Sequence, residues 1–248
     1  AEAGPQPGGQ ALLAQLLPER AEFGGLVTNL VTELGRAQVV IRLNTRVDRA
    51  LIEAERPDAV ILATGSTPYP RGLEGEGGHV IGVADLLSGR ARPGGRVVIA
   101  DWRCDQIGIG LAMLLARRGH DVRLAVAGLC AGQNIPQYLR DLWIGRLHEA
   151  GIAMIPFLRI YGLDQDSAWF LHTTSGAPVE LTGVDSLVLV EGNVPDQSLE
   201  REVADLGLPR LSIGDCLIAR SAEEAIYDGL VRTRDFLGAL AAPAIHGD

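Results

Sequence analysis

Continuous apolar runs alternate with stretches of helical periodicity along this chain of 248 residues. Residues 59–63 form an unbroken apolar run, which is typical of a strand buried on both faces of a sheet, and residues 184–190 indicate a further buried strand. Residues 107–118 have helical periodicity and lie between strand-like segments at 96–100 and 121–126. The order strand, helix, strand is one right-handed crossover unit of a parallel sheet. The pattern therefore predicts an α/β fold.

The expected helices and strands group into two units along the chain, followed by a C-terminal tail. The tail is too short to fold alone, so we expect it to return to the first unit. We therefore predict a first domain at residues 1–80 and 205–248, with a second domain at 81–204 inserted into it. The further expected elements are helices at 25–35, 137–150 and from Ser221 to about Ala241, strands at 39–43 and 152–155, and a hairpin of 168–172 with 179–181.

The stretch of greatest chemical interest lies near the end of the chain, at Gly214-Asp215. A short apolar strand leads into these two residues, and a helix is expected to begin at Ser221, with Glu224 three residues later. That spacing predicts a capping box, in which the two side chains accept free N–H groups of the first helical turn. A glycine lets a ligand approach the backbone, a helix N-terminus favours a phosphate, and Asp215 offers an acceptor for ribose or ribityl hydroxyls. We therefore expect Gly214, Asp215 and Glu224 at a nucleotide cofactor site.

Two further local patterns are compatible with nucleotide binding. Ala63-Thr64-Gly65 follows a predicted strand, and ligands of open sheets bind beyond the carboxyl ends of strands. Glu2 precedes a tight turn at Gly8-Gly9-Gln10, and a carboxylate in that position could accept a ribose hydroxyl. A strand-ending turn explains the first pattern as simply, and an ordinary loop explains the second. Both interpretations stay open from the sequence alone.

A dinucleotide fingerprint is expected after the strand at 96–100, but the residues there do not fit it. The fingerprint needs the pattern G-x-G-x-x-G directly after the strand. Here Asp101 and Asp105 come before Gly108, and both carboxylates would repel a pyrophosphate. Taking Gly108 as the first glycine places Met113 where a small residue must pack against the strand. The sequence thus predicts the fold of a nicotinamide-binding domain without its site.

Composition and charge disfavour several classes of function. The chain has 22 basic and 31 acidic residues and a net charge of −9, so we expect neither nucleic acid nor a membrane as partner. No apolar run reaches transmembrane length, and the three cysteines form no CxxC pair, which favours a reducing cytoplasm. The five histidines have no metal-ligand spacing, and no Ser/His/Asp arrangement is present. We predict neither a metal site nor catalytic residues in this chain.

The motifs, taken in order, resemble the nucleotide-binding region of flavoproteins with two dinucleotide domains. They are Glu2 with Gly8-Gly9-Gln10, Ala63-Thr64-Gly65, and Gly214-Asp215-Cys216. More narrowly, the whole chain resembles the C-terminal part of the trimethylamine dehydrogenase, histamine dehydrogenase and dienoyl-CoA reductase group of NADH:flavin oxidoreductases. The stretch around Gly214-Asp215 looks most similar to N-methylproline (stachydrine-type) demethylases. The resemblance implies two Rossmann-like three-layer domains of the FAD/NAD(P)-binding type, the second inserted in a first that lacks its N-terminal strand and glycine loop.

The resemblance also implies cofactors and partners. Complete enzymes of this group carry FMN and a 4Fe-4S cluster in a barrel ahead of this region, so the substrate site is expected upstream of residue 1. This chain would then hold FAD or ADP. A homo-oligomer and an electron-transfer flavoprotein are the further partners that the resemblance implies.

Three functions follow from these observations. The leading hypothesis is the C-terminal FAD/ADP-binding part of a flavin-dependent oxidoreductase acting on amines or N-methyl amino acids. The alternative is a non-catalytic structural module or a docking module for an electron-transfer partner. The third hypothesis is part of an NADPH-dependent enoate or dienoyl-CoA reductase, which requires glycine loops that this sequence does not show.

Overall fold

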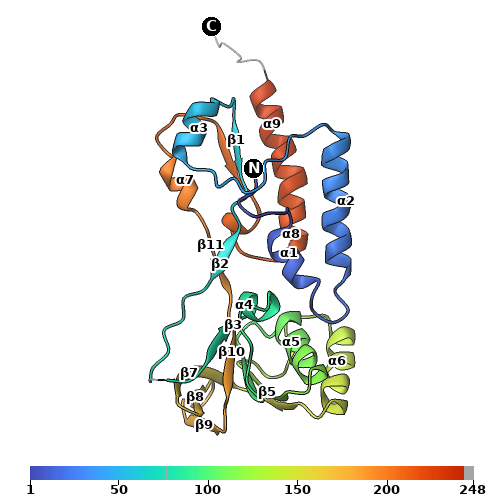
Figure 1. Ribbon diagram of the computed structural model, residues 1–248, viewed down its shortest axis with the longest axis vertical. Helices are drawn as coiled ribbons and strands as arrows, with labels where there is room; N and C mark the ends of the chain where they lie inside the picture. Colours follow the sequence, from blue (N-terminus) through green and yellow to red (C-terminus); the bar gives the residue numbers. More distant parts are fainter. Residues whose placement is uncertain (76, 243–248) are drawn as a thin grey trace. The chain divides into compact units, whose positions relative to one another are not determined.

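The computed structural model describes residues 1–75 and 77–242, and the chain divides into two compact units (Figure 1). Helices α1 (Gly9–Ala14) and α2 (Glu22–Arg36) span boundaries between the units. Residues 243–248 of the expected first domain, including His246, lie outside the described residues. The expected domain bounds stay a prediction. Unit 1 comprises residues 1–9, 31–69 and 193–248, and unit 2 comprises residues 10–30 and 70–192.

Unit 2 is built on a five-stranded parallel sheet of order β3–β10–β4–β5–β6. Helix α5 (Gln106–Arg117) connects β4 to β5, and α6 (Gln137–Glu149) connects β5 to β6, which is the predicted crossover order. Because β10 lies on the other side of β4, the strand order reverses between β4 and β10. The strands are β3 (Val80–Gly82), β4 (Arg96–Asp101), β5 (Asp121–Val126), β6 (Ala153–Ile155) and β10 (Ser186–Val190).

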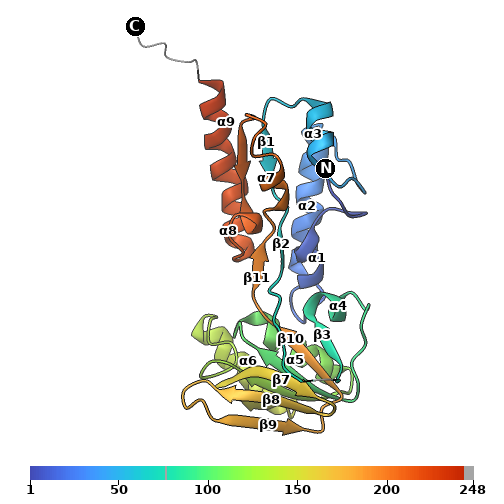
Figure 2. The same ribbon diagram turned by 90° about the vertical axis from the view of Figure 1, so that its left-hand side faces the viewer.

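Side chains that alternate along the strands supply two apolar layers, one on each face of this sheet. Val97 and Ile99 of β4 belong to the layer that includes α5, α6 and α4 (Val83–Leu87). Val98 and Ala100 belong to the layer under the antiparallel strands β7, β8 and β9, which Figure 2 shows beside the parallel sheet. Unit 2 therefore has helices, a parallel sheet and an antiparallel sheet as three layers. The antiparallel strands are β7 (Leu158–Asp164), β8 (Ser167–His172) and β9 (Pro178–Thr182).

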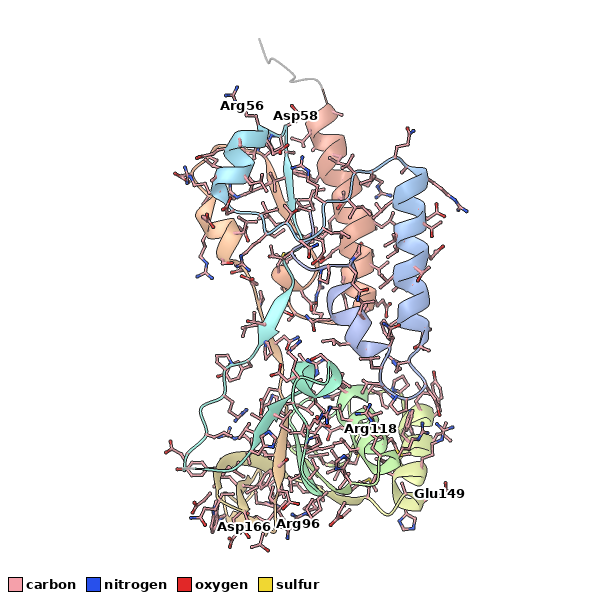
Figure 3. The ribbon with its side chains drawn as sticks, viewed as in Figure 1. Arg56, Asp58, Arg96, Arg118, Glu149 and Asp166 are labelled. Carbon is pink, nitrogen blue, oxygen red and sulfur yellow. The ribbon has the colours of Figure 1, made fainter. Side chains whose placement is uncertain are left out.

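An ion pair anchors the amino end of β4. Arg96 Nη2 lies 2.7 Å from Asp185 Oδ1, and the Arg96 N–H donates to Asp185 Oδ2 at 2.8 Å. These bonds from Arg96 lower the pKa of Asp185 to about 2. The hydrogen bond to Asp185 raises the pKa of Arg96, and the charge of Asp166 adds to this effect. Figure 3 shows Arg96 and Asp166 at this end of the sheet. The opposite, carboxyl end of the sheet is formed by the loops that follow β4, β5 and β10.

Unit 1 contains two short pairs of strands. β1 (Val60–Leu62) pairs in parallel with β12 (Arg210–Ser212), and β2 (Ser66–Pro68) pairs antiparallel with β11 (Asn193–Pro195). Its apolar cluster is small and centres on Ile52, Leu62, Leu199, Val203 and Cys216. The helices are α3 (Arg49–Glu55), α7 (Ser198–Glu202), α8 (Ala222–Tyr227) and α9 (Thr233–Ala241), with a π-helical segment, Asp228–Arg232, between the last two.

The local sequence explains the bounds of α3. The Asp48 carboxylate accepts the Leu51 N–H at 2.9 Å and caps the first turn. Arg56 ends the helix with a φ of 49°, in the left-handed region. Arg56 and Asp58, which Figure 3 labels, lie in the turn that leads into β1.

Two expectations about unit 1 are wrong. Residues 39–43 form no strand; the segment is irregular, and its Arg42 carbonyl accepts the Glu2 N–H at 2.8 Å. The run at 59–63 is a strand over three residues, but it is not buried on both faces, since Ile61 is 38% exposed. Val60 and Leu62 pack on the small cluster around Ile52 and Cys216, so only one face of this strand is covered.

The expectations for unit 2 are mostly confirmed. The helices at 107–118 and 137–150 and the strand at 152–155 are present within one or two residues of the predicted bounds, and the hairpin is β8 with β9. The pattern missed β7, because Gly162 and Asp164 interrupt its apolar character and a register shift occurs between Ile160 and Gly162.

Candidate functional site

The carboxyl ends of β1 and β12 lie side by side in unit 1. Leu62 pairs with Ser212, and the Ile213 N–H donates to the Leu62 carbonyl at 3.0 Å. The buried thiol of Cys216 lies 3.1 Å from the same Leu62 carbonyl, which ties the chain after β12 to the end of β1. The structure therefore brings together two of the predicted motifs, Ala63-Thr64-Gly65 and Gly214-Asp215.

Gly214 begins a single 3₁₀ turn, Gly214–Cys216, with a φ of 61°. A residue with a Cβ is strained in this region, so the glycine is required by the turn itself. The turn directs Asp215 toward both neighbouring segments. Its Oδ2 accepts the Ser66 hydroxyl at 3.1 Å, and its Oδ1 accepts the Arg220 N–H at 3.3 Å. Asp215 thus links β2 to the loop that precedes α8.

Thr64 and Gly65 are held by the segment that follows β11. The Thr64 hydroxyl donates to the Asp196 carbonyl at 2.7 Å, and the Asp196 N–H donates to the Gly65 carbonyl at 3.0 Å. The Ser198 hydroxyl and N–H lower the pKa of the Asp196 carboxyl. Gly65 has a φ of 79°, and a Cβ there would meet nothing within 4 Å. The backbone at Gly65 is therefore open to close approach by a ligand.

A buried carboxylate under the Gly214 turn was missed from the sequence. Asp228 is 3% exposed and lies in the π-helical segment. Its Oδ2 accepts the Gly214 N–H at 3.1 Å and an Arg220 guanidinium N–H at 2.8 Å. The available signal was the pair Asp228-Gly229 inside a helix, because both residues have low helix propensity and π-helical turns are frequent at functional sites.

The capping box predicted at the start of α8 is confirmed. Ser221 Oγ accepts the Glu223 N–H at 3.2 Å, and Glu224 Oε2 accepts the Ser221 N–H at 3.1 Å and the Ser221 hydroxyl. The Ser221 hydroxyl lowers the pKa of Glu224. Ser221 and Glu224 therefore bond to one another and to the helix start, and a cofactor role for Glu224 stays a prediction.

The remaining predicted site residues lie near the N-terminus. The Glu2 carboxylate accepts the Gly4 N–H at 2.7 Å, and the Thr45 N–H donates to the Glu2 carbonyl at 2.9 Å. Gly8 and Gly9 both have positive φ values and lead into α1, and Gln10 belongs to unit 2. Ribose recognition by these residues stays a prediction.

The carboxyl end of the unit 2 sheet has a different electrostatic character. Asp101, the last residue of β4, is 1% exposed, and its Oδ1 accepts the Cys104 N–H at 2.9 Å. Its Oδ2 faces Gly108 in the first turn of α5, so closely that a Cβ at Gly108 would collide with it. Burial, and next the charge of Asp105, raise the pKa of Asp101 to about 7, although the Cys104 N–H opposes them. Gly108 thus makes room for a carboxyl group.

Two more acidic side chains lie at this end of the sheet. Asp105 caps α5 by accepting the Ile107 N–H at 2.9 Å, and it pairs with Arg103 at 2.6 Å. Glu191 follows β10 and pairs with Arg71 at 2.6 Å. The Asp105 carboxylate therefore occupies the N-terminus of α5, and the Asp101 carboxyl lies against its first turn, which agrees with the absence of the glycine fingerprint from the sequence.

In the part of the chain that the structure describes, no group of three or more His, Cys, Asp or Glu side chains is arranged to hold a metal ion. Among residues 1–75 and 77–242, no helix combines the length and the apolarity needed to cross a membrane.

Comparison with known proteins shows similarity to oxidoreductases. No family model matches the chain. It is 29% identical to N,N-dimethylglycine/sarcosine dehydrogenase of Chromohalobacter salexigens, over 95% of this chain and 40% of the relative. It is 26% identical to the probable N-methylproline demethylase of Rhizobium meliloti, over 94% of this chain and 39% of that protein. The chain thus spans about two fifths of the length of these curated relatives.

Solved structures share the fold. Histamine dehydrogenase from Rhizobium sp. 4-9 matches with a TM-score of 0.88 and 18% identity, over 99% of this chain and 40% of that chain. A flavoprotein disulfide reductase from Escherichia coli matches with a TM-score of 0.55 and 18% identity, over 73% of this chain and 44% of that chain. The chain therefore has a mixed α/β fold of the flavoprotein reductase kind. The proteins it resembles include histamine dehydrogenase and an N-methylproline demethylase, as the sequence motifs predicted.

The close contact between Gly108 and Asp101 makes Gly108 sensitive to a single methyl group. We expect Gly108→Ala to lower the free energy of unfolding by about 1–3 kcal/mol, because the new Cβ would collide with the Asp101 carboxyl and force the helix or the buried side chain to shift. Gly145→Ala in α6 is the matched control, since a Cβ there would meet nothing within 4 Å. That control should raise the free energy of unfolding by about 0.5–1 kcal/mol. Urea denaturation of both variants measures the difference, and equal stability would contradict the packing described.

The raised pKa of Asp101 makes the stability of unit 2 depend on pH. Between about pH 4 and 7 the folded chain keeps the Asp101 proton, whereas the unfolded chain has lost it. The free energy of unfolding should therefore fall as pH rises through this window, by up to about 4 kcal/mol. Asp101→Asn, which does not titrate, should flatten that slope and be the more stable protein at pH 8. Denaturation at several pH values checks this, and parallel curves for the two proteins would refute it.

Proposed function

We propose that this chain is part of a flavin-dependent oxidoreductase acting on amines or N-methyl amino acids, and that unit 1 holds FAD or ADP. The observation that carries the proposal is the meeting of Thr64-Gly65 and Gly214-Asp215 at the paired ends of β1 and β12. Ligands of open sheets bind at such carboxyl ends. The open backbone at Gly65 fits an approaching pyrophosphate, and Asp215 offers carboxylate oxygens to ribose or ribityl hydroxyls.

The relatives support the proposed substrate class. N,N-dimethylglycine, sarcosine and N-methylproline in their names are all N-methyl amino acids, so we propose this class for the whole protein. The chain spans about two fifths of these relatives. From the resemblance of its motifs to the trimethylamine dehydrogenase group, we propose that oxidation occurs in an upstream barrel with FMN and a 4Fe-4S cluster. A homo-oligomer and an electron-transfer flavoprotein as acceptor belong to the same proposal.

Within this chain, the proposal assigns binding and orientation and no bond-breaking step. A bound FAD would supply electron transfer, and ADP would have a structural role. We propose that residues 1–80 with 205–248 form the FAD/ADP-binding domain, and that 81–204 form the inserted NAD(P)-binding-like domain. Glu2, Gly8, Gly9, Gln10, Ala63 and Glu224 are the further residues proposed to surround the nucleotide.

An NADPH-dependent enoate or dienoyl-CoA reductase is a weaker proposal for this chain. It requires pyrophosphate at the N-terminus of α5, where Asp105 caps the helix and the Asp101 carboxyl lies against Gly108. The Asp105 carboxylate repels an anion at that point, and the buried Asp101 carboxyl occupies the space beside Gly108 that a pyrophosphate would need.

One observation favours a docking module as the second candidate function. Helices α8 and α9 and the segment between them expose large apolar side chains, which are frequent at protein interfaces. The exposed side chains are Ile226, Tyr227, Leu230, Leu237 and Leu240. A docking module would bind no nucleotide, so a binding measurement separates the two candidates.

Titration of the intact protein with ADP tests the proposed function. We expect calorimetry to show micromolar binding that Asp215→Ala weakens about tenfold or more, because a charge-assisted hydrogen bond to a sugar hydroxyl is lost. Asp235→Ala is the control in the same unit, since Asp235 is an exposed residue of α9 that pairs with Arg234. This control should bind ADP as the wild type does. Absence of ADP and FAD binding in the wild type would favour the docking module.

A further inference from the structure

A single carboxylate oxygen of Asp228 accepts hydrogen bonds from two segments of the chain, the Gly214 turn and the loop that contains Arg220. The Gly214 N–H donates to Oδ2 at 3.1 Å, and Arg220 Nη2 donates to the same atom at 2.8 Å. Arg232, one turn further along the helix, has its Nη1 3.9 Å from it. The Asp228 side chain is 4% exposed, whereas that of Arg220 is 35% exposed. One buried oxygen therefore fixes the Gly214 turn and the Arg220 loop against the helix.

Hydrogen bonds connect Asp228 to Asp215 through Arg220 as well as through the Gly214 backbone. The Arg220 side chain bonds to Asp228, and the Arg220 N–H bonds to Asp215 Oδ1 at 3.3 Å. Asp215 Oδ2 in turn accepts the Ser66 hydroxyl. The orientation of the Asp215 carboxylate therefore depends on the position of Arg220, and the position of Arg220 depends on Asp228.

The backbone explains why such a restraint is needed. Gly214 has a φ of 61°, and a glycine has access to many other conformations when nothing holds it. Asp228 lies in a π-helical segment, where the extra residue of the turn changes the direction of the side chains that follow. The buried acceptor thus stabilises one conformation of a turn that is intrinsically flexible.

We propose that Asp228, acting with Arg220, is the positioning residue that sets the Gly214–Asp215 turn in its nucleotide-binding conformation. The inference rests on the proposed function of unit 1 and adds to it a residue that does not itself touch the nucleotide. Its role is to hold the Gly214 N–H inward, so that the Asp215 carboxylate is presented at the end of β12.

The geometry predicts which substitutions preserve this role. Both donors bond to Oδ2, so the amide oxygen of Asp228→Asn can replace it and accept both hydrogen bonds. Asp228→Leu has a similar volume but no acceptor, and it leaves the Gly214 N–H without a partner. Arg220→Met removes the second donor from a side chain that is already partly exposed, which makes misfolding of this variant a smaller risk.

ADP titration by calorimetry on the intact protein tests the proposal, with thermal melting as the measure of folding. Asp48→Ala is the matched control, because it removes the cap of α3 in the same unit without touching the Gly214 turn. We expect Asp228→Leu and Arg220→Met to raise the Kd for ADP by about tenfold or more, and Asp228→Asn to stay within about threefold of the wild type. Asp48→Ala should lower the melting temperature and leave the Kd unchanged.

The possible outcomes are distinguishable. A wild-type Kd in folded Asp228→Leu, or in Arg220→Met if the leucine variant does not fold, overturns the inference. An equal loss of affinity in Asp228→Asn and Asp228→Leu also overturns it, since the hydrogen-bond acceptor would then be irrelevant. If wild-type protein fails to bind ADP, the proposed function of unit 1 fails and the inference fails with it.

Discussion

The candidate nucleotide site depends on the parallel pairing of β1 with β12. Val60 lies opposite Arg210, so the pairing joins two segments that are far apart in the chain. Closing a loop of that length costs about 4 kcal/mol in chain entropy. The pairing of β2 with β11, the Cys216 thiol at the Leu62 carbonyl and the small cluster around Leu62 together offset this cost. Without this pairing, the Thr64-Gly65 and Gly214-Asp215 motifs would have no common edge.

The two units use acidic residues at strand ends in opposite ways. In unit 1, Asp215 is partly buried at the Gly214 turn and accepts hydrogen bonds from Ser66 and Arg220. In unit 2, Asp101 is buried against Gly108, and burial raises its pKa. The difference is physical: the Asp215 carboxylate lies at a turn where it accepts hydrogen bonds from hydroxyl and N–H groups, whereas the buried Asp101 carboxyl occupies the helix start that an anion would need.

Much of unit 2 could be predicted, because its central strands β4, β5 and β10 are largely buried on both faces and helices follow β4 and β5 in regular order. The capping box at Ser221 and Glu224 was also predictable, since its four residues are adjacent and need no distant partner. The strand expected at 39–43 was wrong, because an apolar run indicates burial or extension but does not show that another strand is present to pair with it. β7 was missed for the converse reason, since Gly162 and a register shift disrupt its pattern although β8 pairs with it.

The sequence by itself determined the α/β class, the acidic character of the chain, the damaged dinucleotide loop after β4 and the Gly214-Asp215 motif. Each of these is a property of neighbouring residues or of composition. Only the tertiary structure decided that Ser66 bonds to Asp215, that Gly108 makes room for Asp101 and that Asp228 lies beneath Gly214. Each of these contacts joins residues on two different secondary-structure elements, so the periodicity of neither element can indicate them. They follow from strand pairing and burial, which are properties of the folded chain as a whole.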